Sequence, residues 1–212
     1  PPASPTDIPT NEELYLAGLR LEQFHNPALE PYPYYEEALR RDPGDVRVNT
    51  ALGLLYLKRG MYREAGERLK TAAARLTFNY TRPKDGETHY YLGVACRRLG
   101  KAVEAEGAFA RAAWDPAWRA ASFRELAELA SAKGAFEQAL EFVDRAVAAA
   151  GADPGTRNLK AALLRRLGRL DDAEVCAKAA ELADPLAPRP LQELHFLKVM
   201  TREAPAARAA SR

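Results

Sequence analysis

The chain has 212 residues, 28% of them charged, and a formal net charge of only +2 at pH 7. This length allows one or two ordinary domains or one array of repeats, and the charge balance gives no reason to expect nucleic acid or a membrane surface as a partner. Ala, Leu, Arg and Glu dominate while Val and Ile are few, which disfavours a sheet-rich fold and favours helices.

The first residues predict a short lead-in to a helix. The segment 1–9 lacks Met and an apolar signal core, so we expect an extended linker and a chain cut from a longer protein. Thr10 and Glu13 have the spacing of a capping box and predict a helix that runs to about Gln23. A second helix follows in YYEEALRRDPGD and stops at Pro43.

Four later segments share one pattern of small residues. A Gly is followed five residues later by Ala and, seven residues beyond, by a second Ala, and the glycines are 40, 34 and 34 residues apart. Gly suits the left-handed end of a first helix, and Ala lets two helices cross closely. The glycines are Gly60, Gly100, Gly134 and Gly168; the alanine pairs are Ala65 and Ala72, Ala105 and Ala112, Ala139 and Ala146, and Ala173 and Ala180.

This 34-residue helix–turn–helix period resembles the tetratricopeptide repeat. The resemblance implies an all-α fold, a right-handed superhelical solenoid of about five helical hairpins with a C-terminal capping helix. Its concave face, lined by the first helix of each pair, would hold an extended peptide or a partner domain. The expected hairpins span about 10–44, 45–79, 85–117, 119–152 and 154–186, followed by a capping helix at 189–203 and a disordered tail at 204–212.

A narrower resemblance rests on five strings in chain order. They are EALRRDPGD, DGETHYYLG, WDPAW, LKAALLRRLGR and ADPLAP, and they resemble the helical-repeat portion of large bacterial proteins that also carry a galactose-mutarotase-like β-sandwich. The resemblance implies an accessory module of a carbohydrate-associated parent, with any sugar chemistry outside this chain.

The sequence predicts no enzyme, cofactor or metal site. It lacks the metalloprotease, paired-cysteine, phosphate-loop and nucleophile-elbow motifs. His25, His89 and His195 fall in three distant units of the array, and His89 is expected to pack in the core. Cys96 and Cys176 lie in apolar helical patterns and are expected to be free thiols.

Two tryptophans flank the junction between the third and fourth hairpins. Trp114 and Trp118 could form a platform on which a sugar stacks, whereas the simpler interpretation has both filling the junction, and the sequence favours the second.

The concave face is expected to be richer in Arg than the near-neutral chain as a whole. Because Arg binds carboxylates through two parallel hydrogen bonds, this predicts an acidic segment of a protein partner, or a neighbouring domain, in the groove. Equally, several of these cations lie in the last turn of a helix, where they complement the helix dipole without any ligand. The predicted groove residues are Arg47, Thr50, Leu54, Lys58, Tyr90, Val94, Arg97, Arg98, Arg124, Glu128, Asn158, Ala162, Arg165 and Arg166.

Other partners are disfavoured. The Lys and Asn of a chaperone-type carboxylate clamp are absent from successive first helices. Aromatic residues do not alternate with basic ones as nucleic-acid stacking would require. No apolar run approaches the length of a membrane helix, and we expect a cytoplasmic protein.

The stretch TFNYTRPKDGETHYY, residues 77–91, interrupts the 34-residue period with six extra residues. Asp85 is expected to cap the next helix, with Glu87 in its first turn. The remaining loop, which includes Asn79, Tyr80 and Arg82, is predicted to contact a partner or neighbouring domain, because loops on rigid scaffolds often carry function.

Overall fold

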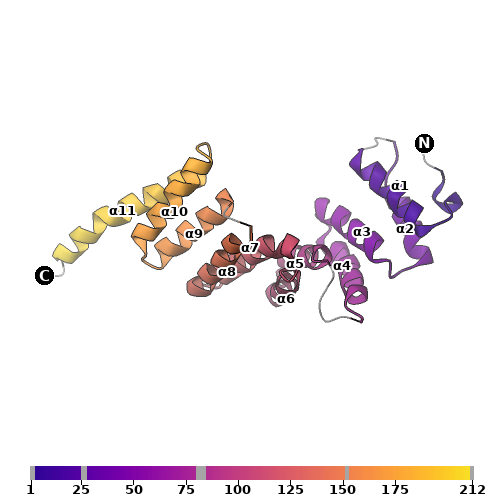
Figure 1. The fold of residues 1–212 in the computed structure, drawn as a ribbon, viewed down its shortest axis with the longest axis horizontal. Helices are drawn as coiled ribbons and strands as arrows, with labels where there is room; N and C mark the ends of the chain where they lie inside the picture. Colours follow the sequence, from indigo (N-terminus) through magenta and orange to yellow (C-terminus); the bar gives the residue numbers. More distant parts are fainter. Residues whose placement is uncertain (1–2, 25–27, 80–84, 151–152, 211–212) are drawn as a thin grey trace. The chain divides into compact units, whose positions relative to one another are not determined.

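The computed structural model describes residues 3–24, 28–79, 85–150 and 153–210. The chain forms two compact units, Pro1–Asp115 and Pro116–Arg212, and each is described by itself. Within the described residues the secondary structure is entirely helical: one short 3-10 helix and eleven α-helices (Figure 1). The all-α prediction of successive helical hairpins is therefore confirmed. No helix in this part of the chain combines the length and apolar character needed to cross a membrane.

The first unit contains three hairpins, formed by consecutive helices that pack against each other (Figure 1). The first helix of each hairpin, in either unit, is called an inner helix below. In the first unit the inner helices are α1 (Asn11–Gln23), α3 (Val46–Lys58) and α5 (Glu87–Arg98), and their partners are α2 (Tyr32–Arg41), α4 (Tyr62–Leu76) and α6 (Ala102–Ala112).

The second unit contains two hairpins and a long C-terminal helix, α11 (Pro188–Ala210), which packs on α10 and α9. Residues 204–210, expected to belong to a disordered tail, form the end of this helix. The inner helices are α7 (Pro116–Ala132) and α9 (Pro154–Arg166), and their partners are α8 (Phe136–Ala150) and α10 (Leu170–Ala183).

The N-terminal segment packs on the first hairpin. The Tyr34 hydroxyl donates to the Ala3 carbonyl at 3.2 Å, and the Arg41 guanidinium donates to the Ile8 carbonyl at 2.8 Å. A 3-10 helix, Pro5–Asp7, precedes α1. The predicted capping box is present, because the Thr10 side chain accepts from the Glu13 N–H while the Glu13 carboxylate accepts from the Thr10 N–H. The residues expected to form a linker are thus held against α2.

The four predicted glycine turns have the left-handed conformation, with φ between 73° and 78°. After α3, the Gly60 N–H donates to the Leu57 carbonyl at 3.1 Å, and the Met61 N–H donates to the Tyr56 carbonyl at 2.9 Å. This pair of bonds is a Schellman motif, and the same pair follows α5, α7 and α9. The prediction that each Gly ends an inner helix is confirmed.

Inside each hairpin a small residue of the inner helix faces the partner helix, and in the first four hairpins the residue that it faces is larger. A Cβ added to Gly53 would lie 2.7 Å from Leu69 Cγ, and one added to Gly93 would lie 2.6 Å from Phe109 Cε1. Gly18 faces Tyr35 in the same way, at 2.5 Å from its Cε1. Ala127 and Val143 occupy the equivalent places in the fourth hairpin, as do Ala161 and Ala177 in the fifth. All eight repeat alanines are buried, as predicted.

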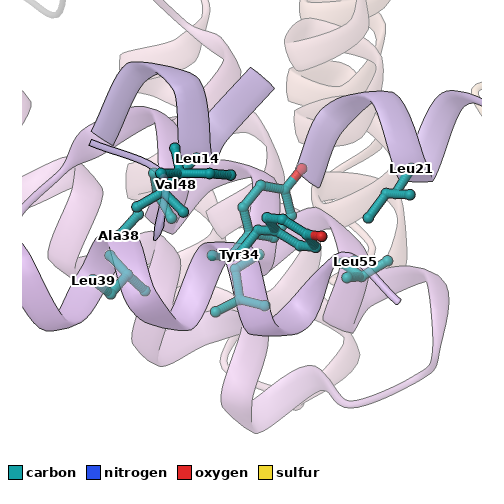
Figure 2. Close-up of a cluster of buried hydrophobic side chains, with 10 residues drawn as sticks. Leu14, Leu21, Tyr34, Ala38, Leu39, Val48 and Leu55 are labelled. Atoms are coloured by element: carbon teal, nitrogen blue, oxygen red, sulfur yellow. The ribbon is translucent and has the colours of Figure 1, made fainter. Parts of the chain in front are cut away.

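Apolar side chains of three helices form the core of the first hairpin and its junction with the second. Figure 2 shows Leu14 and Leu21 of α1 beside Tyr34, Ala38 and Leu39 of α2 and Val48 and Leu55 of α3. Because α3 contributes to this cluster, the first hairpin buries its apolar face against the second, as expected for stacked repeats.

Candidate binding surfaces on the inner helices

The inner helices of the first unit enclose a cavity of about 190 Å³. It lies where α1, α3 and the start of α5 meet, which is the face that the repeat register predicts to be the groove. Seven of its lining residues matter for the chemistry: Tyr15, Glu22, Arg47, Thr50, Asp85, Glu87 and Thr88.

Two of the predicted groove cations in this unit are paired within the chain. The Arg47 guanidinium forms an ion pair with Glu12 and lies over the Tyr15 ring, 5.4 Å from its centre. Lys58 forms an ion pair with Glu22. These partners come from α1, one hairpin earlier, so both cations already have an acidic neighbour.

Two threonines on the cavity wall are almost fully buried. Thr50 is 7% exposed and Thr88 is 2% exposed, and their hydroxyls share one hydrogen bond at 2.8 Å. The prediction placed Thr50 in the groove, and it does line the cavity, although it is not an exposed residue.

The carboxylate of Glu87 lies in an unfavourable setting. Burial raises its pKa, and the nearby negative charge of Asp85 raises it further. Burial also raises the pKa of Tyr15, with Glu87 again contributing in the same direction. The sequence suggested Asp85 as the N-cap of α5, but Gly86 occupies that position. The Asp85 carboxylate nevertheless accepts from the Glu87 N–H at 2.7 Å.

Of the remaining groove candidates on α5, Tyr90 and Arg98 contact aromatic rings of neighbouring helices. Tyr90 lies with its ring centre 5.6 Å from that of Phe109 on α6. Arg98 lies over the Tyr62 ring of α4, at 6.0 Å, and Val94 is half-buried. Arg97 is exposed in the last turn of the helix.

The loop candidates are only partly described. Asn79 is exposed just beyond α4, whereas Tyr80 and Arg82 lie outside the described residues. A partner contact through this loop remains a prediction.

A second cavity, of about 320 Å³, lies in the second unit between α7, α9 and the start of α8. Phe136 and Leu159 give it an apolar wall, and Arg165 and Arg166 give it two guanidinium groups. Ala162, which the repeat register placed in the groove, also lines it.

The two arginines of this cavity differ in what they contact. Arg165 forms two hydrogen bonds with Glu193 of α11, at 2.7 and 3.2 Å, and lies 5.0 Å from the centre of the Phe196 ring. Arg166 is exposed and has no ion pair among the residues that the structure describes. Arg165 therefore helps to dock α11, and Arg166 is the guanidinium that faces solvent.

Two further predicted groove residues carry buried polar atoms. Arg124 Nε and Asn158 Oδ1 are shielded from solvent and have no hydrogen-bond partner within the described residues. Arg124 also acts on Asp153, which caps α9 by accepting from the Gly155 and Thr156 N–H groups at 2.9 and 3.1 Å. Burial raises the pKa of Asp153, but the bonds from Thr156 and Gly155 and the charge of Arg124 outweigh it, so the pKa is lowered overall. Glu128 is half-buried on α7.

The residues considered for other chemistry occupy separate places. Trp114 is 53% exposed in the first unit, whereas Trp118 is half-buried in α7 of the second, so the aromatic platform stays a prediction. His89 is 1% exposed, which confirms its packing role. Cys96 and Cys176 are free, the first buried and the second half-buried.

Sequence reasoning missed the acidic side of the first cavity. The predicted groove residues include Arg47, Thr50 and Leu54 of this cavity but neither Glu22 nor Glu87. Glu22 lies one turn beyond Gly18, at the end of α1, and Glu87 was assigned only a role in the helix dipole. The signal that could have found them is their place on successive inner helices.

Comparison with known proteins agrees with this architecture. Residues 34–67, from α2 to the first part of α4, match the family model for the tetratricopeptide repeat. Among solved structures, the chain resembles PilF of Pseudomonas aeruginosa, with a TM-score of 0.74 and 18% identity over 88% of this chain and 82% of that one. It resembles the MamA protein, with a TM-score of 0.70 and 20% identity over 82% and 92% of the two chains.

A third similar structure is that of YrrB, described as a TPR protein with an unusual peptide-binding site. Its TM-score is 0.66, with 16% identity over 85% of this chain and 86% of that one. These identities establish likeness of fold. Residues 34–67 therefore match one tetratricopeptide repeat, and the chain has the fold of YrrB, a TPR protein.

Proposed function

We propose that this chain is a non-catalytic scaffold that binds a protein partner along its inner helices. Both cavities described above lie on inner helices, one in each unit. Inner helices present side chains from successive hairpins at regular intervals, which suits an extended segment better than a compact small molecule. The peptide-binding site named for YrrB, a structure of the same fold, is consistent with such a role.

The cavity of the second unit favours an acidic partner segment. Arg166 is the observation that carries this proposal, because it combines solvent exposure with a place beside an apolar wall. A guanidinium in such a place can bind a carboxylate through two parallel hydrogen bonds while a neighbouring side chain of the partner contacts Phe136 and Leu159. The groove proposal thus becomes narrower: it concerns the second unit and rests on Arg166 more than on Arg97, Arg98 or Lys58.

Binding of an acidic probe tests this proposal. Acetylated hexaglutamate is titrated into the whole chain and into the Arg166→Glu and Arg63→Glu variants. Arg63 is an exposed residue of α4 outside both cavities, so its reversal makes the same change in net charge. We expect Arg166→Glu to weaken binding about tenfold and Arg63→Glu to change it less than about twofold, since one charge-assisted contact contributes about 1.5–3 kcal/mol. Equal losses in both variants, or no binding to the parent chain, would contradict the proposal.

A second function is carried by the exposed indole of Trp114. An aromatic ring at the surface can stack on a sugar, and this fits the expectation of a carbohydrate-associated bacterial parent. A glycan array with the parent chain and the Trp114→Ala and Trp118→Ala variants tests it. The sugar proposal requires a glycan whose binding is lost with Trp114; binding indifferent to both substitutions contradicts it.

A further inference from the structure

We propose that the cavity of the first unit binds a lysine side chain from a basic segment of a protein partner. This inference rests on the proposal that inner helices bind protein segments, but it assigns to the first unit a ligand of opposite charge to that of the second. It is carried by the balance of charge around the cavity and by the polar groups on its wall.

The charge around this cavity is negative although the groove was predicted to be basic. Glu22, Asp85 and Glu87 line it together with one cation, Arg47. Arg47 is itself paired with Glu12, so it leaves the cavity carboxylates without full compensation. Lys58, which does not line the cavity, neutralises Glu22 through an ion pair. Asp85 and Glu87 are then the cavity carboxylates that have no ion pair among the described residues.

The raised pKa of Glu87 shows that the ionised form of this carboxylate is destabilised at the cavity. Burial and the charge of Asp85 both act against its ionised form. Like charges that are held together in a partly buried place attract a cation, because the cation removes the repulsion between them. An ammonium group beside Asp85 and Glu87 would therefore gain two carboxylate partners.

The buried threonines supply the rest of a binding site. Thr50 and Thr88 line the cavity, are more than nine-tenths buried, and share a single hydrogen bond. Two hydroxyls contain two O–H donors and four lone pairs, so one bond leaves one donor and three lone pairs with no partner among the described residues. Buried hydroxyls with spare hydrogen-bonding capacity favour a polar ligand group over an apolar one.

The shape of the cavity favours lysine. Leu19, Val46 and Leu54 give it apolar lining that the methylene stem of lysine can cover, while the ammonium reaches the carboxylates. A volume of about 190 Å³ has room for one long side chain and not for a folded element. The occupant is therefore one side chain of an extended segment.

A basic probe tests the inference directly. Acetylated hexalysine is titrated by calorimetry into the whole chain and into Asp85→Asn/Glu87→Gln, which keeps a side-chain oxygen at position 85 to accept from the backbone N–H of position 87. The matched control is Glu64→Gln/Glu67→Gln, two exposed carboxylates of α4 outside the cavity, which makes the same change in net charge. We expect the cavity variant to lose at least about fivefold in affinity and the control less than about twofold.

Two outcomes would overturn the inference. One is an equal loss in the cavity variant and the control, which would mean that hexalysine responds to net charge alone. The other is the absence of hexalysine binding to the parent chain. Circular dichroism of each variant shows that it remains folded, and Glu87→Gln alone serves if the double variant does not fold. Hexaglutamate binding of the same variants separates this result from the proposal for the second unit, which does not depend on Asp85 or Glu87.

Discussion

A glycine where two helices meet sets the size of the side chain that can face it. Gly93 lies against the ring of Phe109, and Gly53 lies against Leu69. In the fourth hairpin the pair is Ala127 and Val143. The inner helix thus carries a methyl group in place of glycine, and the residue opposite it is smaller than Phe109 or Leu69. The two members of each pair therefore have to be considered together.

Substitution of Gly93 tests this relation. We expect Gly93→Ala to lower the free energy of unfolding by about 1–3 kcal/mol, because the new Cβ would lie 2.6 Å from the Phe109 ring. Gly107→Ala is the control: no atom lies within 4 Å of its added Cβ in α6, so it should raise the free energy of unfolding by about 0.5–1 kcal/mol. Urea denaturation measures both. Adding Phe109→Val to Gly93→Ala should cost less than the sum of the single changes, and simple additivity would contradict the pairing.

Because His89 is buried and its pKa is lowered, we expect the free energy of unfolding to depend on pH. Its ring is 1% exposed, both ring nitrogens are without a partner among the described residues, and burial, with the charge of Arg111, lowers its pKa below 6.5. The unfolded chain then binds the proton at a higher pH than the folded chain does. The His89 contribution to the free energy of unfolding is thus constant above about pH 6.5 and falls as the pH decreases from there toward the folded pKa.

The measurement is urea denaturation of the parent chain and His89→Phe at several pH values between neutral and mildly acidic. The parent should lose more stability on acidification than the variant, since Phe keeps the aromatic packing and cannot be protonated. His195→Gln, on exposed helix surface, is the control and should keep the parent slope. Identical slopes for the parent and His89→Phe would show that His89 is not the responsible group.

At the scale of elements, the C-terminal helix α11 is held in place by the side chains that it packs against the fifth hairpin. Helix α11 inserts Leu197 into a cluster with Leu164 and Ala161 of α9 and Ala173 and Ala177 of α10. Arg165 and Glu193 add an ion pair whose side chains are 16% and 13% exposed. The helix therefore covers apolar surface of the fifth hairpin and is held in place by a largely buried ion pair.

Leu197 tests the covering role of α11. We expect Leu197→Ala to lower the free energy of unfolding of the second unit by about 2–4 kcal/mol, because it leaves a cavity at a site that is 3% exposed. Val199→Ala, at a residue that is 38% exposed on the same helix, should change it by less than about 0.5 kcal/mol. Denaturation followed by circular dichroism checks both, and equal effects would mean that α11 does not pack as described.

The sequence predicts the hairpins well because their signals are local. A Gly and two alanines within 13 residues determine where a helix ends and where the next one crosses it, and all four such sets behave as expected. The Gly18–Tyr35 pair lies outside this pattern, and its members are 17 residues apart, whereas Gly53 and Leu69 are 16 apart. The first hairpin thus obeys the same packing rule outside the repeat register.

The charge around the two cavities is harder to predict, because it depends on side chains that are distant in sequence. The register places Lys58 and Arg165 on inner helices correctly, but their partners Glu22 and Glu193 lie 36 and 28 residues away. Periodicity identifies the face on which a cation lies and gives no information on the side chain that neutralises it. The same limit explains why the acidic lining of the first cavity was not foreseen.

At the scale of the whole molecule, the net charge is close to zero, but the two cavities are lined by charged groups of opposite sign. The chain has 31 Lys and Arg against 29 Asp and Glu, yet the first unit has a cavity with carboxylates in excess and the second has a cavity with two guanidinium groups. The net charge of the chain is thus a poor guide to the charge that lines either cavity. A partner segment for one cavity should be rejected by the other, because like charges repel on close approach.

The last prediction follows from this separation. If both sites act through charge, the affinities for hexalysine and for hexaglutamate should both fall as ionic strength rises from about 0.01 M to about 1 M, which shortens the Debye length from about 30 Å to about 3 Å. Asp85→Asn/Glu87→Gln should reduce the salt dependence for hexalysine alone, and Arg166→Glu should reduce it for hexaglutamate alone. Titrations of both peptides at several salt concentrations measure this. If either variant changed the salt dependence for both peptides equally, the two cavities would not be separate sites, because each substitution alters the lining of only one of them.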